Sequence, residues 1–434
     1  MAPAGDSPSG RHTVDGLSSD ADVALLQPST VSAQHTNSGV RRNDKTGSQS
    51  DLSPKAQAIR EACKLRRVDD LKELALSKGG FLSDSLRQQA WPVLLGLAPE
   101  DEVIDLDGPS VTDRASSWRE LPRHRDEDQV QLDVDRAFVY YPNLENPVEL
   151  ERRKADLSDL IVEVLRRHPY LCYFQGYHDI CQVFLLVLEP AQCSLAVSRL
   201  SVLRIRDFML PNLTPAIAQL RLLPDILDAA DPALWRHLSQ TEPFFALSGT
   251  LTMYAHDVQT LGEIARLFDA LLALDPTFSV YVFAAIVLSR RDELFDTPDS
   301  EPEMLHSILS KLPQPLDLDA LLARAAELVV RHRPDRLPAW RHVSAASVLK
   351  TARDTATCAA QSMSYGRACF DRQVRELEFA EKRDKLKAAL WRYRRPARAV
   401  AFAVAFGVLA FWLRRSPGPQ AYVTDLLSRW IGGH

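Results

Sequence analysis

Residues 149–169 read ELERRKADLSDLIVEVLRRHP, and their apolar side chains recur at three- and four-residue spacing. This spacing predicts an α-helix with one apolar face. The residues on that face are Leu150, Leu157, Leu160, Ile161, Val164 and Leu165. Further helical patterns follow between proline and Asp-Pro breaks, for example TLGEIARLFDALLAL at 260–274 and DLDALLARAAELVVRH at 317–332. Because convincing period-2 alternation and hairpin signals are missing, the sequence predicts an all-α fold.

The composition narrows the classes of function. The chain has 434 residues, 46% of them hydrophobic, and a formal net charge of -5, so no global basic field indicates nucleic acid as a partner. Its six cysteines are scattered without a C-x-x-C pair, which argues against a disulfide framework and a structural zinc site. No P-loop or dinucleotide-binding glycine motif occurs, so the chain is not expected to bind a nucleotide by itself.

Changes in composition divide the chain into segments. Residues 1–52 are polar and lack aromatic side chains, and we expect them to be disordered. Ser53-Pro54 is a helix cap followed by proline at the first helical position, so folded structure should begin there. We assign 53–345 to one helical domain and 346–398 to a polar, basic and partly helical linker.

An apolar run near the C-terminus suggests a membrane anchor. Residues 399–413, AVAFAVAFGVLAFWL, carry no charge. As a helix they span about 22 Å, less than the hydrocarbon core of about 30 Å, although flanking arginines can extend the span by snorkelling. A buried core helix is the alternative, but the polar linker and the tryptophans near both edges favour a membrane. The predicted membrane-facing residues include Ala399, Phe402, Phe406, Leu409, Phe411, Trp412 and Leu413.

The charges flanking this run predict its orientation. The upstream flank is more basic than the downstream one, which predicts that the helical domain is cytosolic and that the tail, 414–434, is luminal. The segment is short, which favours thin membranes of the early secretory pathway. We therefore expect a single-pass, tail-anchored protein of the endoplasmic reticulum membrane, or of the early Golgi.

The common catalytic arrangements find little support. Cys172 and Cys181 flank His178, but no third residue completes a nucleophile-and-base arrangement. His178-Asp179 is at most half of a metal site, since no second cluster supports it, and we predict no metal. Carboxylate pairs such as Asp225 and Asp228 are expected on a solvated helix face.

Three short strings remain. In RQQAWPVLLG, Arg87 and Trp91 lie one helical turn apart. In VQLDVDR, Asp133 and Arg136 have i,i+3 spacing. In YFQGYHDI, Gln175 precedes a glycine at the entrance of an apolar helix. Each string taken alone has an ordinary interpretation, namely a packing tryptophan, a surface ion pair and a helix start.

Taken in this order in an all-α chain, the strings resemble the three signature motifs of the TBC domain, the Rab GTPase-activating fold. Those motifs are R-x-x-x-W, I-x-x-D-x-x-R and Y-x-Q, and the resemblance covers roughly residues 76–343. Val130 stands where the family has Ile, and the Thr-x-Pro that follows the family's arginine is absent after Arg136. The sequence FQGYHDI and the C-terminal apolar run resemble the branch anchored in the endoplasmic reticulum membrane, whose members act on the Rab (Ypt in fungi) of ER-to-Golgi traffic.

This resemblance implies a catalytic pair and its supports. Arg136 would enter the GTPase as an arginine finger, and Gln175 would orient the attacking water. The implied supporting residues are Asp133, Tyr173, Gly176, Arg87 and Trp91. GTP and Mg²⁺ would belong to the GTP-bound Rab, so the chain needs no cofactor and acts in trans, without hydrolase activity of its own. The alternatives are a catalytically inactive TBC module that tethers a Rab at a membrane, and a membrane-shaping scaffold, which would not need the three motifs.

Overall fold

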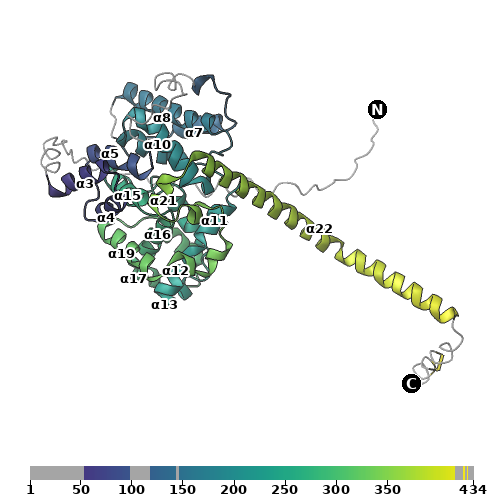
Figure 1. The fold of residues 1–434 in the computed structure, drawn as a ribbon. Helices are drawn as coiled ribbons and strands as arrows, with labels where there is room; N and C mark the ends of the chain where they lie inside the picture. The colour runs from purple at the N-terminus through teal and green to yellow at the C-terminus, as the bar shows by residue number, and fades with distance from the viewer. Residues whose placement is uncertain (1–52, 98–117, 143–145, 416–423, 426–427, 429–434) are drawn as a thin grey trace, which may run out of the picture. The chain divides into compact units, whose positions relative to one another are not determined.

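The computed structural model describes residues 53–97, 118–142, 146–415, 424–425 and 428. The regular structure within these ranges is helical throughout, so the prediction of an all-α fold is confirmed (Figure 1). The disordered tail predicted over 1–52 lies outside the described residues, as does most of the luminal tail predicted over 414–434.

The helices follow one another with short connections. The first are α3 (Pro54–Lys64), α4 (Val68–Leu76), α5 (Asp84–Leu94), α7 (Glu127–Val134), α8 (Pro147–Arg167), α9 (Tyr177–Val187) and α10 (Pro190–Leu203). The next are α11 (Thr214–Leu220), α12 (Leu222–Ala230), α13 (Pro232–His237), α14 (Leu247–Leu251), α15 (Leu261–Ala273) and α16 (Phe278–Ser289). The last are α17 (Arg291–Phe295), α18 (Pro302–Leu309), α19 (Leu318–Arg331), α20 (Val348–Thr351), α21 (Thr355–Ala360) and α22 (Met363–Arg415). Short 3₁₀ turns occupy Trp118–Glu120, Arg206–Phe208, Pro243–Ala246, Pro334–Arg336 and Pro338–His342.

Local sequence explains where the first helix begins. The hydroxyl oxygen of Ser53 accepts a hydrogen bond from the backbone N–H of Ala56 at 3.1 Å, and Pro54 occupies the first turn. This arrangement satisfies one of the N–H groups that a helix start leaves without an intrahelical partner. The predicted helix start is therefore confirmed.

The core lies where apolar helix faces meet. Helix α16 is buried along most of its length and packs against α19 and α12, while α15 packs against α4, α5 and α9. On α8 the predicted face is buried from Leu157 to Leu165, and Leu150 is half-buried near the first turn. Helices α7, α8 and α10 gather at one end of this unit, with α12, α13, α17 and α19 at the other (Figure 1).

The compact unit extends to Asp371, past the boundary predicted at 345. Val348, Leu349 and Cys358, from the first part of the predicted linker, are buried. Residue 96 shows how closely α21 approaches α5, because a Cβ built on this glycine would lie 2.0 Å from the carbonyl oxygen of Ala359. The few apolar residues in this polar stretch form no clear period, so their burial could not be read from the sequence.

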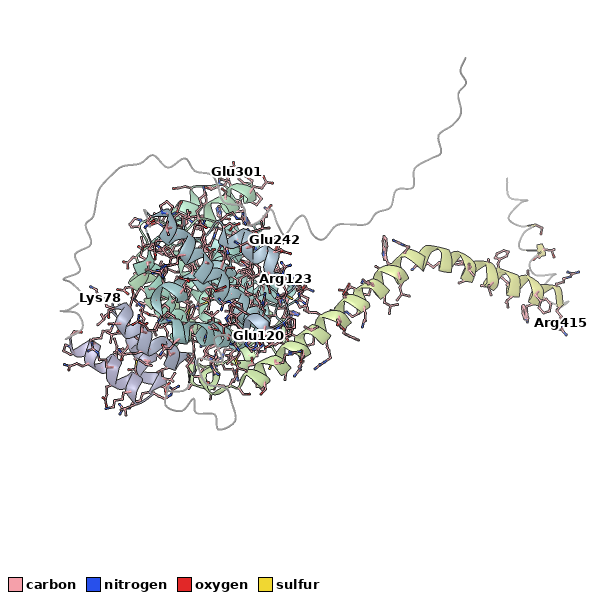
Figure 2. The ribbon with its side chains drawn as sticks, turned by 90° about the horizontal axis from the view of Figure 1, so that it is seen from above. Lys78, Glu120, Arg123, Glu242, Glu301 and Arg415 are labelled. Atoms are coloured by element: carbon pink, nitrogen blue, oxygen red, sulfur yellow. The ribbon has the colours of Figure 1, made fainter. Side chains whose placement is uncertain are left out.

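Helix α22 runs without interruption through the rest of the predicted linker and the predicted anchor to Arg415 (Figure 2). Among the residues that the structure describes, no helix has a stretch both long and apolar enough to cross a membrane, and the predicted anchor over 399–413 is not supported. The physical reason is the length of the uncharged run, which arginines bound at both ends. Of the predicted membrane-facing residues, those with described side chains are exposed, namely Phe402, Phe406, Leu409, Phe411 and Trp412, while the side chains of Ala399 and Leu413 are not described.

Candidate functional site

The end of α7 presents an arginine to solvent. Asp133 lies in the last turn of α7 and is fully buried, whereas the side chain of Arg136, one turn later, is 59% exposed. Nη2 of Arg136 donates a hydrogen bond to Oδ1 of Asp133 at 2.7 Å, and its Nε donates to the carbonyl oxygen of Leu132 at 3.3 Å. The guanidinium is thus held at one edge and open at the other.

Asp133 collects donors from two segments of the chain. Besides Arg136, Gln129 donates its amide N–H to Oδ1 at 3.1 Å, and the hydroxyl of Tyr173 donates to Oδ2 at 2.9 Å. Burial, together with the Asp133 carboxylate, raises the pKa of Tyr173 well above its ordinary value, so the hydroxyl keeps its proton and remains a donor. A buried carboxylate with this many donors is a fixed anchor for the guanidinium.

Gln175 is brought to the same region by the loop before α9. It is half-buried and stands between Tyr173 and Gly176, the residue that precedes the first turn of α9. Gly176 has a φ of 95°, and a Cβ there would lie 2.5 Å from Cγ2 of Thr252, so this position requires glycine for both its backbone angle and its close contact. The backbone N–H of Tyr173 donates to Asp126 at 2.9 Å. Tyr173 therefore joins the glutamine loop to both ends of α7.

A second link to α9 comes from Gln182, which the sequence analysis did not select. Its amide N–H donates to the carbonyl oxygen of Tyr141 at 2.9 Å, and its Oε1 accepts from the backbone N–H of Phe138 at 3.0 Å. Gln182 is buried in an otherwise apolar helix. A lone polar residue within such a run is the signal that could have marked it, since buried polar groups need partners.

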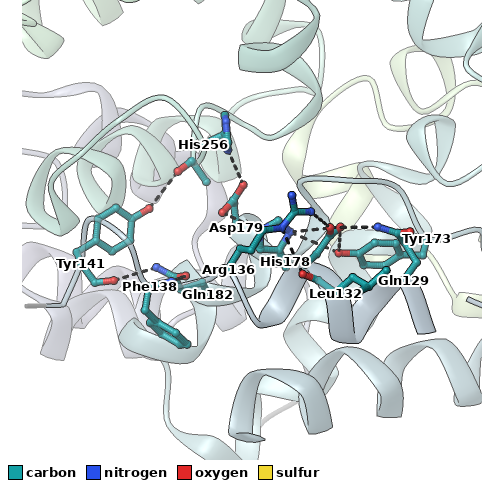
Figure 3. A network of polar contacts seen from close by, with 12 residues as sticks. Gln129, Leu132, Arg136, Phe138, Tyr141, Tyr173, His178, Asp179, Gln182 and His256 are labelled. Carbon is teal, nitrogen blue, oxygen red and sulfur yellow. Dashed lines mark hydrogen bonds and ion pairs between the residues drawn. The ribbon is translucent and has the colours of Figure 1, made fainter. Parts of the chain in front are cut away.

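Polar side chains continue from Asp133 along the first turn of α9 (Figure 3). Nδ1 of His178 lies 3.4 Å from the Tyr173 hydroxyl and 3.9 Å from Oδ2 of Asp133. Nε2 of His178 lies 3.3 Å from Oδ1 of Asp179, and Oδ2 of Asp179 lies 3.0 Å from Nδ1 of His256. The hydrogen bond with Asp179 raises the pKa of His256 above its ordinary value.

The histidines and acids of this region do not form a recognisable metal centre. Over the described ranges, no group of three or more His, Cys, Asp or Glu side chains has an arrangement that could hold a metal ion. The sequence pair His178-Asp179 instead belongs to the polar network around Asp133. This network is where the structure brings together residues that the sequence had separated by tens of positions.

Arg87 and Trp91 lie in a different cluster, around the carboxylate of Asp269 in α15. Nε of Arg87 donates to Oδ1 of Asp269 at 3.0 Å, and the indole N–H of Trp91 donates to the same oxygen at 2.9 Å. Asp269 is fully buried and was not predicted. The Trp91 ring lies 5.4 Å from that of Phe184 in α9, measured between centroids. These residues thus support α9 through its packing, at a remove from Arg136 and Gln175.

Comparisons with known proteins agree with this arrangement. The model of the Rab-GTPase-TBC domain matches residues 84–295, a range that contains all three sequence motifs. GTPase-activating protein gyp10 of Schizosaccharomyces pombe is 33% identical over 316 residues, which cover 72% of this chain and 81% of that protein. TBC1 domain family member 20 of Homo sapiens is 34% identical over 272 residues, which cover 62% of this chain and 65% of the relative.

Among solved structures, the Ypt/Rab-GAP domain of Gyp1p is similar with a TM-score of 0.49 and 15% sequence identity. The match covers 63% of this chain and 98% of that one.

Proposed function

The chain belongs to the Rab-GTPase-TBC domain family, and we propose that it accelerates GTP hydrolysis by a Rab GTPase. One observation carries the proposal. The buried carboxylate of Asp133 holds the exposed guanidinium of Arg136 and also the hydroxyl of Tyr173, two residues before Gln175. A cation and an amide are thereby tied to one fixed point, which is the arrangement that a two-finger activator requires.

Arg136 supplies the charge in this mechanism. GTP hydrolysis increases the negative charge on the transferring phosphoryl group and on the leaving oxygen. An arginine inserted from outside stabilises that charge through a planar set of donors, and such fingers contribute about 10³ to 10⁵ in rate. Because Asp133 occupies only one edge of the guanidinium, the remaining N–H groups can face the phosphate.

Gln175 supplies the second finger, which orients the attacking water. Its amide offers both a donor and an acceptor, so it can contact the water and a neighbouring group at the same time. Gly176 allows the backbone to approach the partner closely, because it has no side chain. GTP and Mg²⁺ are carried by the GTPase, and the residues of this chain only position and neutralise.

We further propose that the substrate is a Rab of the early secretory pathway, met at the cytosolic surface of the endoplasmic reticulum or early Golgi. The sequence support is the FQGYHDI string together with the similarity to gyp10 and to TBC1 domain family member 20. A catalytically inactive module that only tethers a Rab is the second candidate. The presence of both Arg136 and Gln175 favours activity, since a tether needs neither finger.

The deciding experiment measures phosphate release from a panel of purified, GTP-loaded Rabs, with and without the full-length chain. A large acceleration for early-secretory Rabs would support the whole proposal. Acceleration confined to other Rabs would contradict the substrate but keep the activity. Binding without acceleration across the panel would favour the tether.

A further inference from the structure

His178, Asp179 and His256 form a continuous polar chain beside the two fingers, which we name the α9 relay. We infer that the α9 relay is a positioning device that fixes the glutamine finger relative to the arginine finger. This inference rests on the proposed function. Its three residues take no part in the finger mechanism itself, and two of them come from the first turn of α9, directly after Gln175 and Gly176.

The need for such a device follows from the local backbone. Gln175 precedes a glycine with a φ of 95°, and glycine resists backbone rotation less than any other residue. The loop is tied on its upstream side by Tyr173, whose hydroxyl reaches Asp133. Without a second tie on the downstream side, the amide would be free to pivot about Gly176. The α9 relay provides that tie.

The relay makes contact at both of its ends. At one end, Nδ1 of His178 lies 3.4 Å from the Tyr173 hydroxyl and 3.9 Å from Asp133, the residue that holds Arg136. At the other end, Asp179 and Nδ1 of His256 are hydrogen-bonded at 3.0 Å. The side chains of His178 and Asp179 are only 11% and 16% exposed, so these contacts are largely shielded from water.

His256 is itself held in an unusual backbone segment. The two residues Met253 and Tyr254 both have positive φ, 50° and 66°, which is uncommon for side chains of this size. The Tyr254 hydroxyl donates to the carbonyl oxygen of Ser279 at 2.7 Å, and the Tyr141 hydroxyl donates to that of Ala255 at 3.2 Å. Strained backbone of this kind persists where the surroundings over-determine it, and it concentrates at functional sites.

The charges of the relay alternate in sign along the network. His178 lies between the carboxylates of Asp133 and Asp179, while the cationic form of His256 is favoured by its hydrogen bond with Asp179. Asp257 is the other acid beside His256. An imidazole between carboxylates contributes an oriented, charge-assisted contact, and such contacts hold geometry more strictly than neutral ones.

The test uses the full-length chain and the Rab that responds best in the panel. His256→Ala removes the downstream tie, and we expect kcat to fall by about ten- to a hundredfold, since small misplacements of catalytic groups cost factors of this size. KM, the melting temperature and binding of the Rab loaded with a non-hydrolysable GTP analogue should stay at wild-type values. His256→Asn should restore most of kcat, because its amide N–H takes the place of Nδ1–H.

His237→Ala is the matched control, because His237 is also half-buried and hydrogen-bonded but contacts Leu294 and Thr297 instead of the relay. It should keep wild-type kcat. Wild-type kcat in His256→Ala, or an equal loss of kcat in the alanine and asparagine variants at wild-type melting temperature, would overturn the inference. A rise in KM alone would overturn it as well and identify His256 as a docking contact. A wild-type chain without activity would instead overturn the proposed function on which the inference rests.

Discussion

Replacing Arg136 by alanine separates catalysis from folding more cleanly than any other change in this chain. The side chain is 59% exposed and its one ion pair is with Asp133. An exposed pair of this kind contributes under about 1 kcal/mol to the free energy of unfolding. Asp133 keeps its hydrogen bonds from Gln129 and Tyr173 when the arginine is gone, so no buried charge is left without donors. We therefore expect a melting temperature close to that of the wild type.

The expected loss of activity is far larger. A finger that contributes about 10³ to 10⁵ in rate corresponds to about 4 to 7 kcal/mol of the activation barrier. Single-turnover phosphate release from the responsive Rab would measure this loss as a fall in kcat/KM. Arg136→Lys should also fail, because a point charge does not reproduce the planar donor set.

Arg324→Ala is the matched control for this experiment. Arg324 is 45% exposed and pairs with Glu327 at 2.7 Å with the same i,i+3 spacing, but on α19. It should keep full activity. If purified Arg136→Ala still accelerated hydrolysis within a few-fold of the wild type, Arg136 would not be the finger, and the argument from Asp133 would be wrong.

Three further changes test other parts of the molecule. Gln175→Ala should be severely impaired in hydrolysis and should weaken the aluminium fluoride complex with the GDP-loaded Rab; full activity would mean that the Rab positions the water itself. Asp269→Asn removes the buried partner of Arg87 and should lower the free energy of unfolding by about 3 to 5 kcal/mol in a denaturant titration, whereas a loss as small as that of a surface pair would contradict this role. Burial raises the pKa of Asp257 to about 6 from an ordinary 3.8. Its contribution to stability is thus present below about pH 4 and is lost as pH rises through 6, so the melting temperature of Asp257→Asn relative to the wild type should increase over that interval, and a constant difference would count against it.

The sequence alone predicted the features that depend on neighbouring positions. Apolar spacing indicated the helices, and Ser53-Pro54 indicated where the first one begins, because caps and periodicity are local properties. The i,i+3 spacing of Asp133 and Arg136 likewise predicted their proximity, since one helical turn separates them. The motifs also identified the family, which the comparisons then showed independently.

Contacts between distant segments were decided only by the tertiary structure. The sequence contains no sign that Asp269 would meet Arg87 and Trp91, or that His256 would reach Asp179, because these pairs lie 182, 178 and 77 positions apart. The same holds for the segment after 345, whose few apolar residues become buried only because α5 and α10 lie beside them. The sequence could therefore name the two fingers, while packing of separate helices determined which residues hold them in place.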